Sequence, residues 1–174
     1  DDLPNTARKI GEQYVFTPRV DDITGTDPPA INWSVLPERV FASGVVPMQA
    51  STGCPYQCAF CNFTKDRRMI SVKPLDDIVA ELKAVEKRGA RYVCFVDDNF
   101  RLGRSDLEEV CRRFVDEKIS LQWMSFIRTE TLRNVDLKLL REAGCSELRF
   151  GLESGDRQIL ANMRKKSDPD YARE

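Results

Sequence analysis

The sequence STGCPYQCAFCNF, residues 51–63, places three of the chain's six cysteines close together in the spacing C-x3-C-x2-C. These three are Cys54, Cys58 and Cys61. A closed structural metal site fills every coordination position with a protein ligand, yet no fourth cysteine or histidine follows nearby. The segment therefore predicts a metal site held by three thiolates, and it raises the question of what completes the coordination.

The remaining composition narrows the chemistry. The chain contains no histidine, which excludes Ser-His-Asp and Cys-His dyads, Cys2His2 zinc fingers and histidine-ligated haem or cobalt. Six cysteines in 174 residues are too sparse for a small secreted disulfide scaffold, and their clustering is typical of metal or redox chemistry in a reducing compartment. We therefore expect a cytoplasmic protein.

Charge and hydropathy exclude two classes of partner. A net charge of −1 creates no field that would attract nucleic acid, so none is expected as a partner. No apolar run is long enough to span a bilayer, and nothing resembles a signal peptide. The length of 174 residues predicts one domain with a sizeable core.

The chain divides into two parts. Residues 1–45 hold five of the nine prolines and show no sustained periodicity, which predicts an extended connector lying along a surface. In residues 46–174, short apolar runs alternate with helical patterns. The predicted strands are 45–52, 91–98, 120–127 and 147–154, and the predicted helices are 74–89, 105–118, 134–144 and 157–165.

The alternation of strands and helices predicts an α/β fold with right-handed crossovers and a parallel sheet, either open or curled into a barrel. Start and stop signals for the helices are Pro74 and Gly89, the capping-box pair Ser105 and Glu108, and Asn134 and Gly144. The apolar stripes are Leu75, Ile78, Val79, Leu82 and Val85 in the first helix and Leu107, Val110, Cys111, Phe114 and Val115 in the second.

Polar residues gather where the predicted strands end, and the carboxyl ends of parallel strands are where chemistry collects in such folds. After the cysteine loop, these are Asp97-Asp98-Asn99, Arg128-Thr129-Glu130 and Glu153-Ser154-Gly155. We expect them to form one site with the cysteines. By contrast, the run Arg164-Lys165-Lys166 is typical of a solvated helix face.

Two kinds of metal site fit the three thiolates. A zinc module needs a fourth ligand, but Cys94 and Cys111 lie in apolar patterns typical of buried cysteines, and Cys145 follows a helix stop at the opposite end of the fold. A [4Fe–4S] cluster needs only one thiolate per iron. With three irons bound, the fourth iron stays open for a ligand that is not protein.

At this point the sequence resembles a known family. The segment CPYQCAFC, residues 54–61, is similar to the signature of the radical S-adenosylmethionine (radical SAM) enzymes, with Phe60 at its aromatic position. FVDDNF at 95–100 and LRFGLESGDRQILANMRK at 148–165 are similar to the branch whose radical SAM domain follows a cobalamin-binding domain. INWSVLPERV at 31–40 resembles the linker between those two domains.

The resemblance implies a [4Fe–4S] cluster on the three cysteines and the reductive cleavage of S-adenosylmethionine (SAM) to a 5′-deoxyadenosyl radical. It also implies an electron donor such as flavodoxin or ferredoxin, and cobalamin with methyl transfer in the branch named above. The cofactors perform this chemistry while the protein positions and shields them. The substrate is not specified by these residues.

The resemblance also assigns roles to single residues. Phe60 would pack beside the adenine of SAM. Asp97 or Asp98 would receive its ammonium group, although the family usually carries a Gly-Gly-Glu-like stretch there and a helix-capping role is the alternative for Asp98 or Asn99. Arg128 would pair with the methionine carboxylate, with a salt bridge to Glu130 as the alternative.

The residue pattern of the fourth predicted strand indicates what each of its two faces contacts. Period-two alternation puts Leu148, Phe150 and Leu152 on the face toward the helices and Arg149, Gly151 and Glu153 on the face toward the barrel interior. Glu153 is then placed to accept hydrogen bonds from the ribose hydroxyls. Gly53 and Gly151 either allow close approach of a cofactor or serve as turn and packing residues.

The resemblance finally predicts an incomplete unit. The radical SAM fold is a partial (β/α) barrel with more strands than the four predicted here, so this barrel would be truncated after about four βα units. The fourth strand would be an exposed edge with an uncovered apolar face. We expect either a longer enzyme of which this is the N-terminal catalytic part, following an absent cobalamin-binding domain, or another chain that covers the edge.

Overall fold

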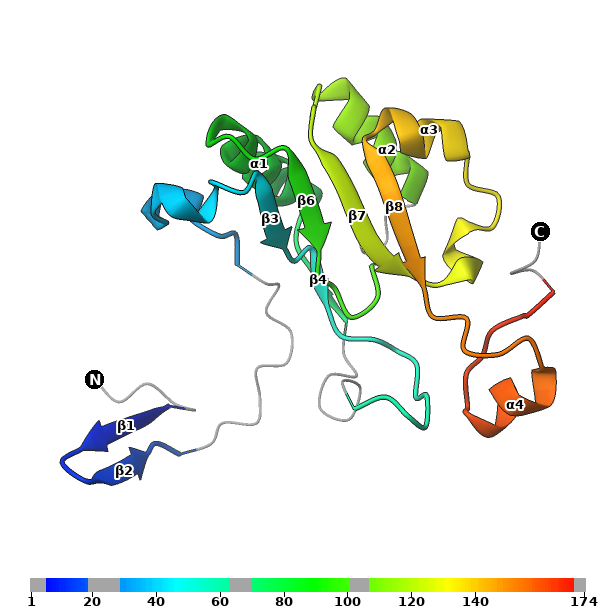
Figure 1. The fold of residues 1–174 in the computed structure, drawn as a ribbon, viewed down its shortest axis with the longest axis horizontal. Helices are drawn as coiled ribbons and strands as arrows, with labels where there is room; N and C mark the ends of the chain where they lie inside the picture. The colour runs from blue at the N-terminus through cyan, green and yellow to red at the C-terminus, as the bar shows by residue number, and fades with distance from the viewer. Residues whose placement is uncertain (1–5, 19–28, 63–69, 101–106, 171–174) are drawn as a thin grey trace.

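The computed structural model describes residues 6–18, 29–62, 70–100 and 107–170, and its centre is a parallel sheet of four strands. The strands are β3 (Val45–Met48), β6 (Tyr92–Phe95), β7 (Gln122–Ile127) and β8 (Cys145–Phe150), in that order across the sheet. Neighbours in the sheet are also neighbours among the predicted strands, so the chain moves across the sheet in one direction (Figure 1). The predicted α/β class and parallel sheet are confirmed.

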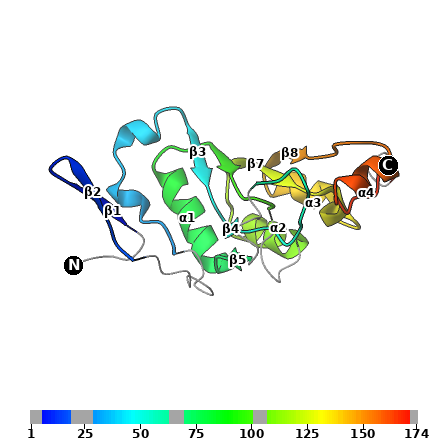
Figure 2. The same ribbon diagram turned by 90° about the horizontal axis from the view of Figure 1, so that it is seen from below.

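Three helices cover one face of this sheet (Figures 1 and 2). They are α1 (Leu75–Lys87), α2 (Leu107–Asp116) and α3 (Leu137–Glu142), while α4 (Arg157–Asn162) lies beyond the end of β8. The predicted stripe of α1 packs as expected, with Leu75 only partly buried. On α2 the stripe is confirmed except at Val115, which is 38% exposed.

The core between sheet and helices is centred on Trp123 of β7. Its ring lies 5.9 Å from that of Phe95, 5.6 Å from that of Phe100 and 6.4 Å from that of Phe114. The indole Nε1 donates to the Ala143 carbonyl at 2.8 Å, so the ring is buried without an unsatisfied donor. This aromatic cluster holds β6, β7 and α2 together below the carboxyl ends of the strands.

The first predicted strand, 45–52, is two strands in the structure. β3 ends at Met48, and β4 (Ser51–Thr52) pairs antiparallel with β5 (Ser71–Val72). The cause is Asp97, whose carboxylate accepts hydrogen bonds from the backbone N–H groups of Ala50 and Ser51. Because these groups bond to a side chain, the ladder between β3 and β6 stops here and the chain turns toward the cysteine loop.

Helix caps differ from the prediction at one helix. Asn134, the predicted cap of α3, has a left-handed backbone with φ 64°, and the N-cap is Asp136, whose side chain accepts from Lys138 N at 2.8 Å. Both residue types cap helices well, so the sequence alone favoured the wrong one of two candidates that lie two positions apart. Ser105 of the predicted capping box lies outside the described residues.

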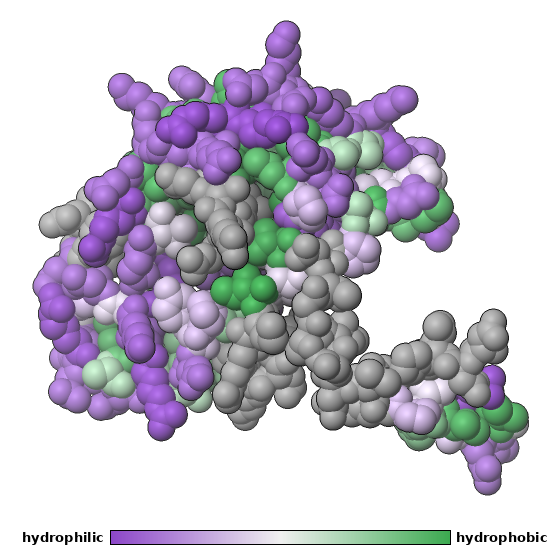
Figure 3. All heavy atoms as spheres, turned by 180° about the vertical axis from the view of Figure 1, so that it is seen from behind, coloured by the Kyte–Doolittle hydropathy of each residue, from purple (hydrophilic) through white to green (hydrophobic). Residues whose placement is uncertain are grey.

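The N-terminal part is more structured than an extended connector. Residues 7–16 form an antiparallel hairpin of β1 (Ala7–Ile10) and β2 (Gln13–Phe16), and two 3-10 helices follow, η1 (Trp33–Val35) and η2 (Glu38–Val40). In Figure 3 the hairpin stands apart and carries hydrophobic side chains, while the outward side of the helices is mostly hydrophilic. The side chains of the hairpin are largely exposed to solvent, and Phe16, for example, is 74% exposed.

Residues 31–41 are fixed to α1 by a buried polar cluster. Glu81 on α1 accepts hydrogen bonds from Ile31 N and Trp33 Nε1, both at 3.0 Å, and pairs with Lys73 at 2.6 Å. Lys73 and Glu81 are 4% and 3% exposed, and Trp33 and Phe41 belong to the hydrophobic core. This part of the predicted connector is therefore integrated into the folded domain.

The predicted exposed edge is present. In the part of the chain that the structure describes, no strand pairs with the outer edge of β8, and residues 7–16 add none to the sheet. The strand ends at Phe150 rather than at residue 154, so the predicted alternation continues only that far. Leu148 packs against the core, but Phe150 and Leu152 are 38% and 47% exposed and do not belong to it.

Candidate cofactor site

The cysteine loop starts where β4 ends. Gly53 has φ 85°, a left-handed conformation that favours glycine, and its N–H donates to Asp98 Oδ2 at 2.9 Å. This turn carries the chain over the carboxyl ends of the sheet, so Gly53 has the turn role that was one of its two predicted roles. Cys54, Cys58 and Cys61 follow, all three half-buried.

The three cysteines line one cavity of about 210 Å³. The other lining residues come from the loop, from the ends of β6, β7 and β8, and from the segment after α4: Tyr56, Phe60, Asp98, Asn99, Phe126, Ile127, Arg128, Arg149, Gly151 and Lys165. The fold thus brings the cysteines together with three of the other predicted site residues, Phe60, Asp98 and Arg128. Asp97 and Glu153 are not among the residues that line it.

The two neighbouring aspartates have different surroundings. Asp97 is 3% exposed, and its carboxylate accepts from Ala50 N, Ser51 N and Ser51 Oγ. Burial raises the pKa of Asp97, with the hydrogen bonds from Ser51 and Ala50 acting in the opposite sense. The Asp97 carboxylate is therefore already hydrogen-bonded to the backbone between β3 and β4, whereas Asp98 is half-buried and lines the cavity.

Arg128 is held by several partners. Its Nε lies 3.2 Å from Glu130 Oε2, its Nη2 donates to the carbonyl of Lys166 and to Ser167 Oγ at 2.9 Å, and the guanidinium lies 3.9 Å from the centre of the Tyr56 ring. The side chain is only 11% exposed. The salt bridge to Glu130, predicted as the alternative to carboxylate binding, is present.

Lys165 was missed by the sequence analysis, which placed it on a solvated helix face. In the structure α4 ends at Asn162, and Lys165 is 9% exposed. Its Nζ lies 3.2 Å from Glu153 Oε1 and 5.8 Å from the centre of the Phe60 ring. No signal in the local sequence marked this lysine, because its burial results from the turn after α4.

Glu153 and Gly151 both lie next to the Lys165 ammonium group. Glu153 has φ 59° and lies outside the strand, so strand alternation does not set its direction. A Cβ at Gly151 would lie 2.6 Å from Glu153 Oε1 and 3.0 Å from Lys165 Nζ. The absence of a side chain at Gly151 therefore makes room for the pair, which brings Glu153 to the border of the cavity.

One lining residue has an unused hydrogen-bonding atom. Asn99 is 8% exposed, and its Oδ1 has no partner among the described residues. A buried amide oxygen without a partner is costly in a folded protein, and a bound ligand that donates a hydrogen bond would remove that cost. The sequence analysis expected Asn99 in the site but assigned it no contact with SAM.

The donor set fits an iron–sulfur cluster. Within the described ranges, no three His, Cys, Asp or Glu side chains converge closely enough to hold one metal ion. The loop thiols line one cavity, an arrangement that suits a cluster with one thiolate per iron. Burial raises the pKa of the Cys54 thiol, with the Tyr56 N–H and the Arg128 charge acting in the opposite sense.

The other three cysteines lie away from the cavity. Cys111 and Cys145 are buried, and burial raises the pKa of Cys145 to about 11. Cys94 was predicted to be buried but is half-buried, with its Sγ beside the Met124 sulfur. All six cysteines are free thiols.

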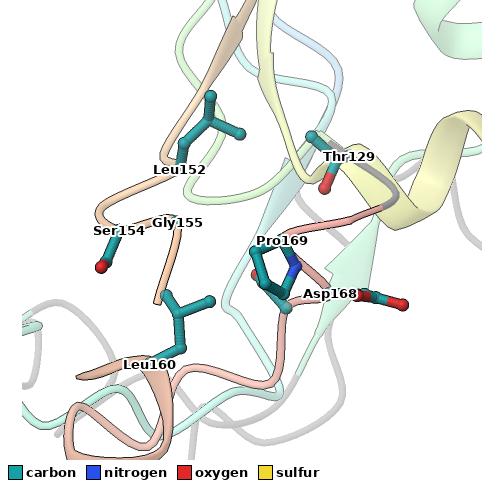
Figure 4. A pocket seen from close by; sticks show the side chains of 8 residues that line it. Thr129, Leu152, Ser154, Gly155, Leu160, Asp168 and Pro169 are labelled. Carbon is teal, nitrogen blue, oxygen red and sulfur yellow. The ribbon is translucent and has the colours of Figure 1, made fainter. Parts of the chain in front are cut away.

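A second cavity, of about 200 Å³, lies between the β8–α4 connection and residues 167–169 (Figure 4). Leu152, Leu160 and Pro169 surround it, together with Thr129 and Asp168.

Among the described residues, no helix is long and apolar enough to cross a membrane.

Comparison with known proteins agrees with this geometry. The sequence model of the radical SAM superfamily matches residues 48–174, which include the cysteine loop and the whole four-stranded sheet apart from the first residues of β3. The chain belongs to the radical SAM superfamily.

Several methyltransferases are similar to this radical SAM chain. An uncharacterized methyltransferase of Pyrococcus horikoshii is 28% identical over 81% of the chain and 32% of its own length. The bacteriochlorophyllide d C-12(1)-methyltransferase of Chlorobaculum tepidum is 26% identical over 84% of the chain and 33% of its own length. The hopanoid C-2 methylase of Rhodopseudomonas palustris is 30% identical over 68% of the chain and 24% of its own length.

The chain thus spans a quarter to a third of the length of these relatives. Among solved structures, the fold resembles that of the radical SAM methyltransferase TsrM from Kitasatospora setae, solved with cobalamin and a [4Fe–4S] cluster bound. The TM-score is 0.61 and the sequence identity 17%, over 69% of this chain and 24% of TsrM. The predicted radical SAM type of α/β fold is confirmed by these matches.

Proposed function

We propose that this radical SAM chain binds a [4Fe–4S] cluster through Cys54, Cys58 and Cys61 and holds SAM in the adjoining cavity. The observation that carries the proposal is the convergence of three half-buried thiols on one cavity with an aromatic ring and a carboxylate, those of Phe60 and Asp98. When bound, the cluster supplies the electron for reductive cleavage of SAM. The protein binds, orients and shields the reactants.

The surrounding side chains divide the task of orienting SAM. Asp98 is the aspartate that receives the ammonium group, because Asp97 is occupied by backbone donors. The Oδ1 of Asn99, which has no partner in the part of the chain that the structure describes, is a further acceptor for the same end of the ligand. The exposed ring of Phe60 packs beside the adenine, and Glu153, held by Lys165, accepts from the ribose hydroxyls.

For the complete protein we propose methyl transfer to a small substrate, with cobalamin as a further cofactor. The named relatives are methyltransferases, and TsrM was solved with cobalamin. This chain has no histidine, so it supplies no histidine ligand to the cobalt. We assign residues 1–45 to the connector after a cobalamin-binding domain and residues 46–174 to the catalytic domain, with residues 31–41 of the connector packed onto that domain.

The same proposal includes a reducing partner and compartment. The cluster needs a low-potential one-electron donor, for which flavodoxin or ferredoxin is the chemical match. Six free thiols suit the cytoplasm, where thiols stay reduced.

Anaerobic reconstitution with iron and sulfide tests the core of the proposal. The protein should take up about four irons per chain, and its EPR spectrum should change when SAM is added. Replacing Cys54, Cys58 or Cys61 by alanine should abolish uptake, while Cys94→Ala, Cys111→Ala and Cys145→Ala should retain it. Colourless protein holding one zinc ion per chain would support the alternative, a non-catalytic metal module.

A further inference from the structure

The turn that follows α4, residues 163–167, forms a wall of the cysteine cavity. Arg164 is in the left-handed region with φ 53°, and the backbone N–H groups of Arg164 and Lys165 donate to the carbonyls of Ala161 and Leu160, both at 2.9 Å. This arrangement ends the helix and reverses the chain, although the position usually holds glycine. The reversal directs Lys165 into the cavity, between Glu153 and the Phe60 ring.

This turn touches the cysteine loop directly at one backbone position. Ala59, between the second and third cysteines, donates its N–H to the Met163 carbonyl at 2.8 Å. A single backbone hydrogen bond at a half-exposed site contributes little stability. Lys165 Nζ makes a second, weak contact between turn and loop, 5.8 Å from the centre of the Phe60 ring, so a stronger side-chain contact would add most to holding the two together.

Arg128 supplies that contact from the end of β7. One edge of its guanidinium donates to the turn, at the Lys166 carbonyl and Ser167 Oγ, and its face lies on the ring of Tyr56, between the first two cysteines. Glu130 fixes its Nε. Arginine can make these contacts together because its donors are coplanar and its face stacks on aromatic rings.

We propose that Arg128 is a positioning residue that fastens the cysteine loop to the turn after α4 and keeps a positive charge beside the cluster. This inference rests on the proposed cluster site, and it replaces the role of binding the methionine carboxylate. The fastening protects the three thiols and the iron they hold from solvent. The charge stabilises the reduced, more negative cluster, which raises its reduction potential.

Two substitutions separate the fastening from the charge. Arg128→Met removes both, whereas Arg128→Lys keeps the charge but loses the planar donor edge. Arg149→Met is the matched control. Arg149 lines the same cavity, but its partners among the described residues are Glu147, hydrogen-bonded at 2.6 Å, and the Phe126 ring, which belong to neither the cysteine loop nor the turn. If Arg128→Met does not fold, Ser167→Ala removes one anchoring bond and leaves the charge in place.

The first measurement uses the protein without cluster. Alkylation of Cys54, Cys58 and Cys61, followed by mass spectrometry, should be about tenfold faster in Arg128→Met, partly faster in Arg128→Lys and unchanged in Arg149→Met. In loaded protein, iron release to a chelator should follow the same order. The reduction potential should become more negative in Arg128→Met and stay near the wild-type value in Arg128→Lys.

Thiol alkylation in Arg128→Met at the rate of the Arg149→Met control would overturn the inference. So would equal binding of SAM and decarboxylated SAM by loaded Arg128→Met when the wild type prefers SAM, because that result assigns Arg128 to the carboxylate. Failure of the proposed function has a different signature. The wild type then takes up no cluster, while alkylation of the three thiols still decides whether Arg128 fastens the loop.

Discussion

Asp97 and Asp98 are chemically identical and adjacent, yet their surroundings give them different tasks. The sequence placed both at the carboxyl end of a strand and could not choose between them. The choice depends on the positions of the Ala50 and Ser51 N–H groups, which lie just after β3 and are brought close to Asp97 by the β3–β6 pairing. Strand patterns predict where a side chain lies along the chain, but not which distant donors face it.

This division of tasks predicts opposite phenotypes. Asp97→Ala leaves the donors of Ala50 and Ser51 without their partner and should lower the free energy of unfolding by about 3 kcal/mol. Asp98→Ala loses one bond to Gly53 and should cost about 1 kcal/mol, but it should weaken SAM binding by loaded protein. Urea unfolding and equilibrium SAM binding measure the two effects. Equal loss of stability in both variants would contradict the assignment.

Cys145 gives a prediction about pH. Its pKa is raised to about 11 by burial, so its neutral form is favoured in the folded state. The stabilisation that the neutral thiol gives to the folded state is fully present below its unfolded pKa of about 9. It is lost as the pH rises toward 11. The wild type should therefore lose more stability than Cys145→Ala between pH 9 and pH 11. Parallel pH dependence of chemical unfolding in the two proteins would show that the thiol ionises as it does in the unfolded chain.

Among the elements, those with a strong hydrophobic period were predicted well and the irregular segments were not. The α1 stripe and the presence and order of the four sheet strands follow from apolar spacing alone, although the ends of β3 and β8 differ from the predicted ones. The turn after α4 was misread as a helix face because Arg164 adopts a left-handed conformation that its residue type does not signal. The burial of Lys165, and with it the ion pair between Lys165 and Glu153, could therefore not be predicted.

The segment before β3 was also misread, and the buried cluster around Glu81 explains why. Its members, Ile31, Trp33, Lys73 and Glu81, come from three separate segments, and no local pattern connects them. Glu81→Ala would leave the Lys73 charge buried without a partner and two donors unsatisfied. We expect a loss of about 3 to 5 kcal/mol in the free energy of unfolding.

A second substitution separates the charge from the packing. Glu81→Leu combined with Lys73→Met should recover a large part of the loss, because the apolar pair leaves no buried charge. Glu117→Ala is the control, since its ion pairs with Lys83 and Arg113 lie at the surface and should contribute little. A double variant no more stable than Glu81→Ala would show that the hydrogen bonds to residues 31–33, and not the charge, dominate.

The assembled sheet brings the predicted site together but leaves one side of the molecule uncovered. Four parallel strands place the cysteine loop, Asp98 and Arg128 around one cavity, as the order of strands implied. Among the described residues, β8 has an outer edge without a partner strand, and next to it Phe150, Leu152 and Ile159 are 38%, 47% and 45% exposed. Unpaired backbone groups beside exposed apolar side chains favour association with another strand.

The isolated 174-residue chain should therefore self-associate through the β8 edge as its concentration rises. Phe150→Lys and Leu152→Lys, which put charge on this edge, should shift sedimentation velocity profiles toward the monomer with little change in stability, because both side chains are already partly exposed. Val35→Lys is the control: Val35 is 73% exposed on η1 and is remote in sequence from β8. An equal shift in the control would assign the association to general surface charge. A wild-type chain that stays monomeric at every concentration would show that the edge is protected by other means.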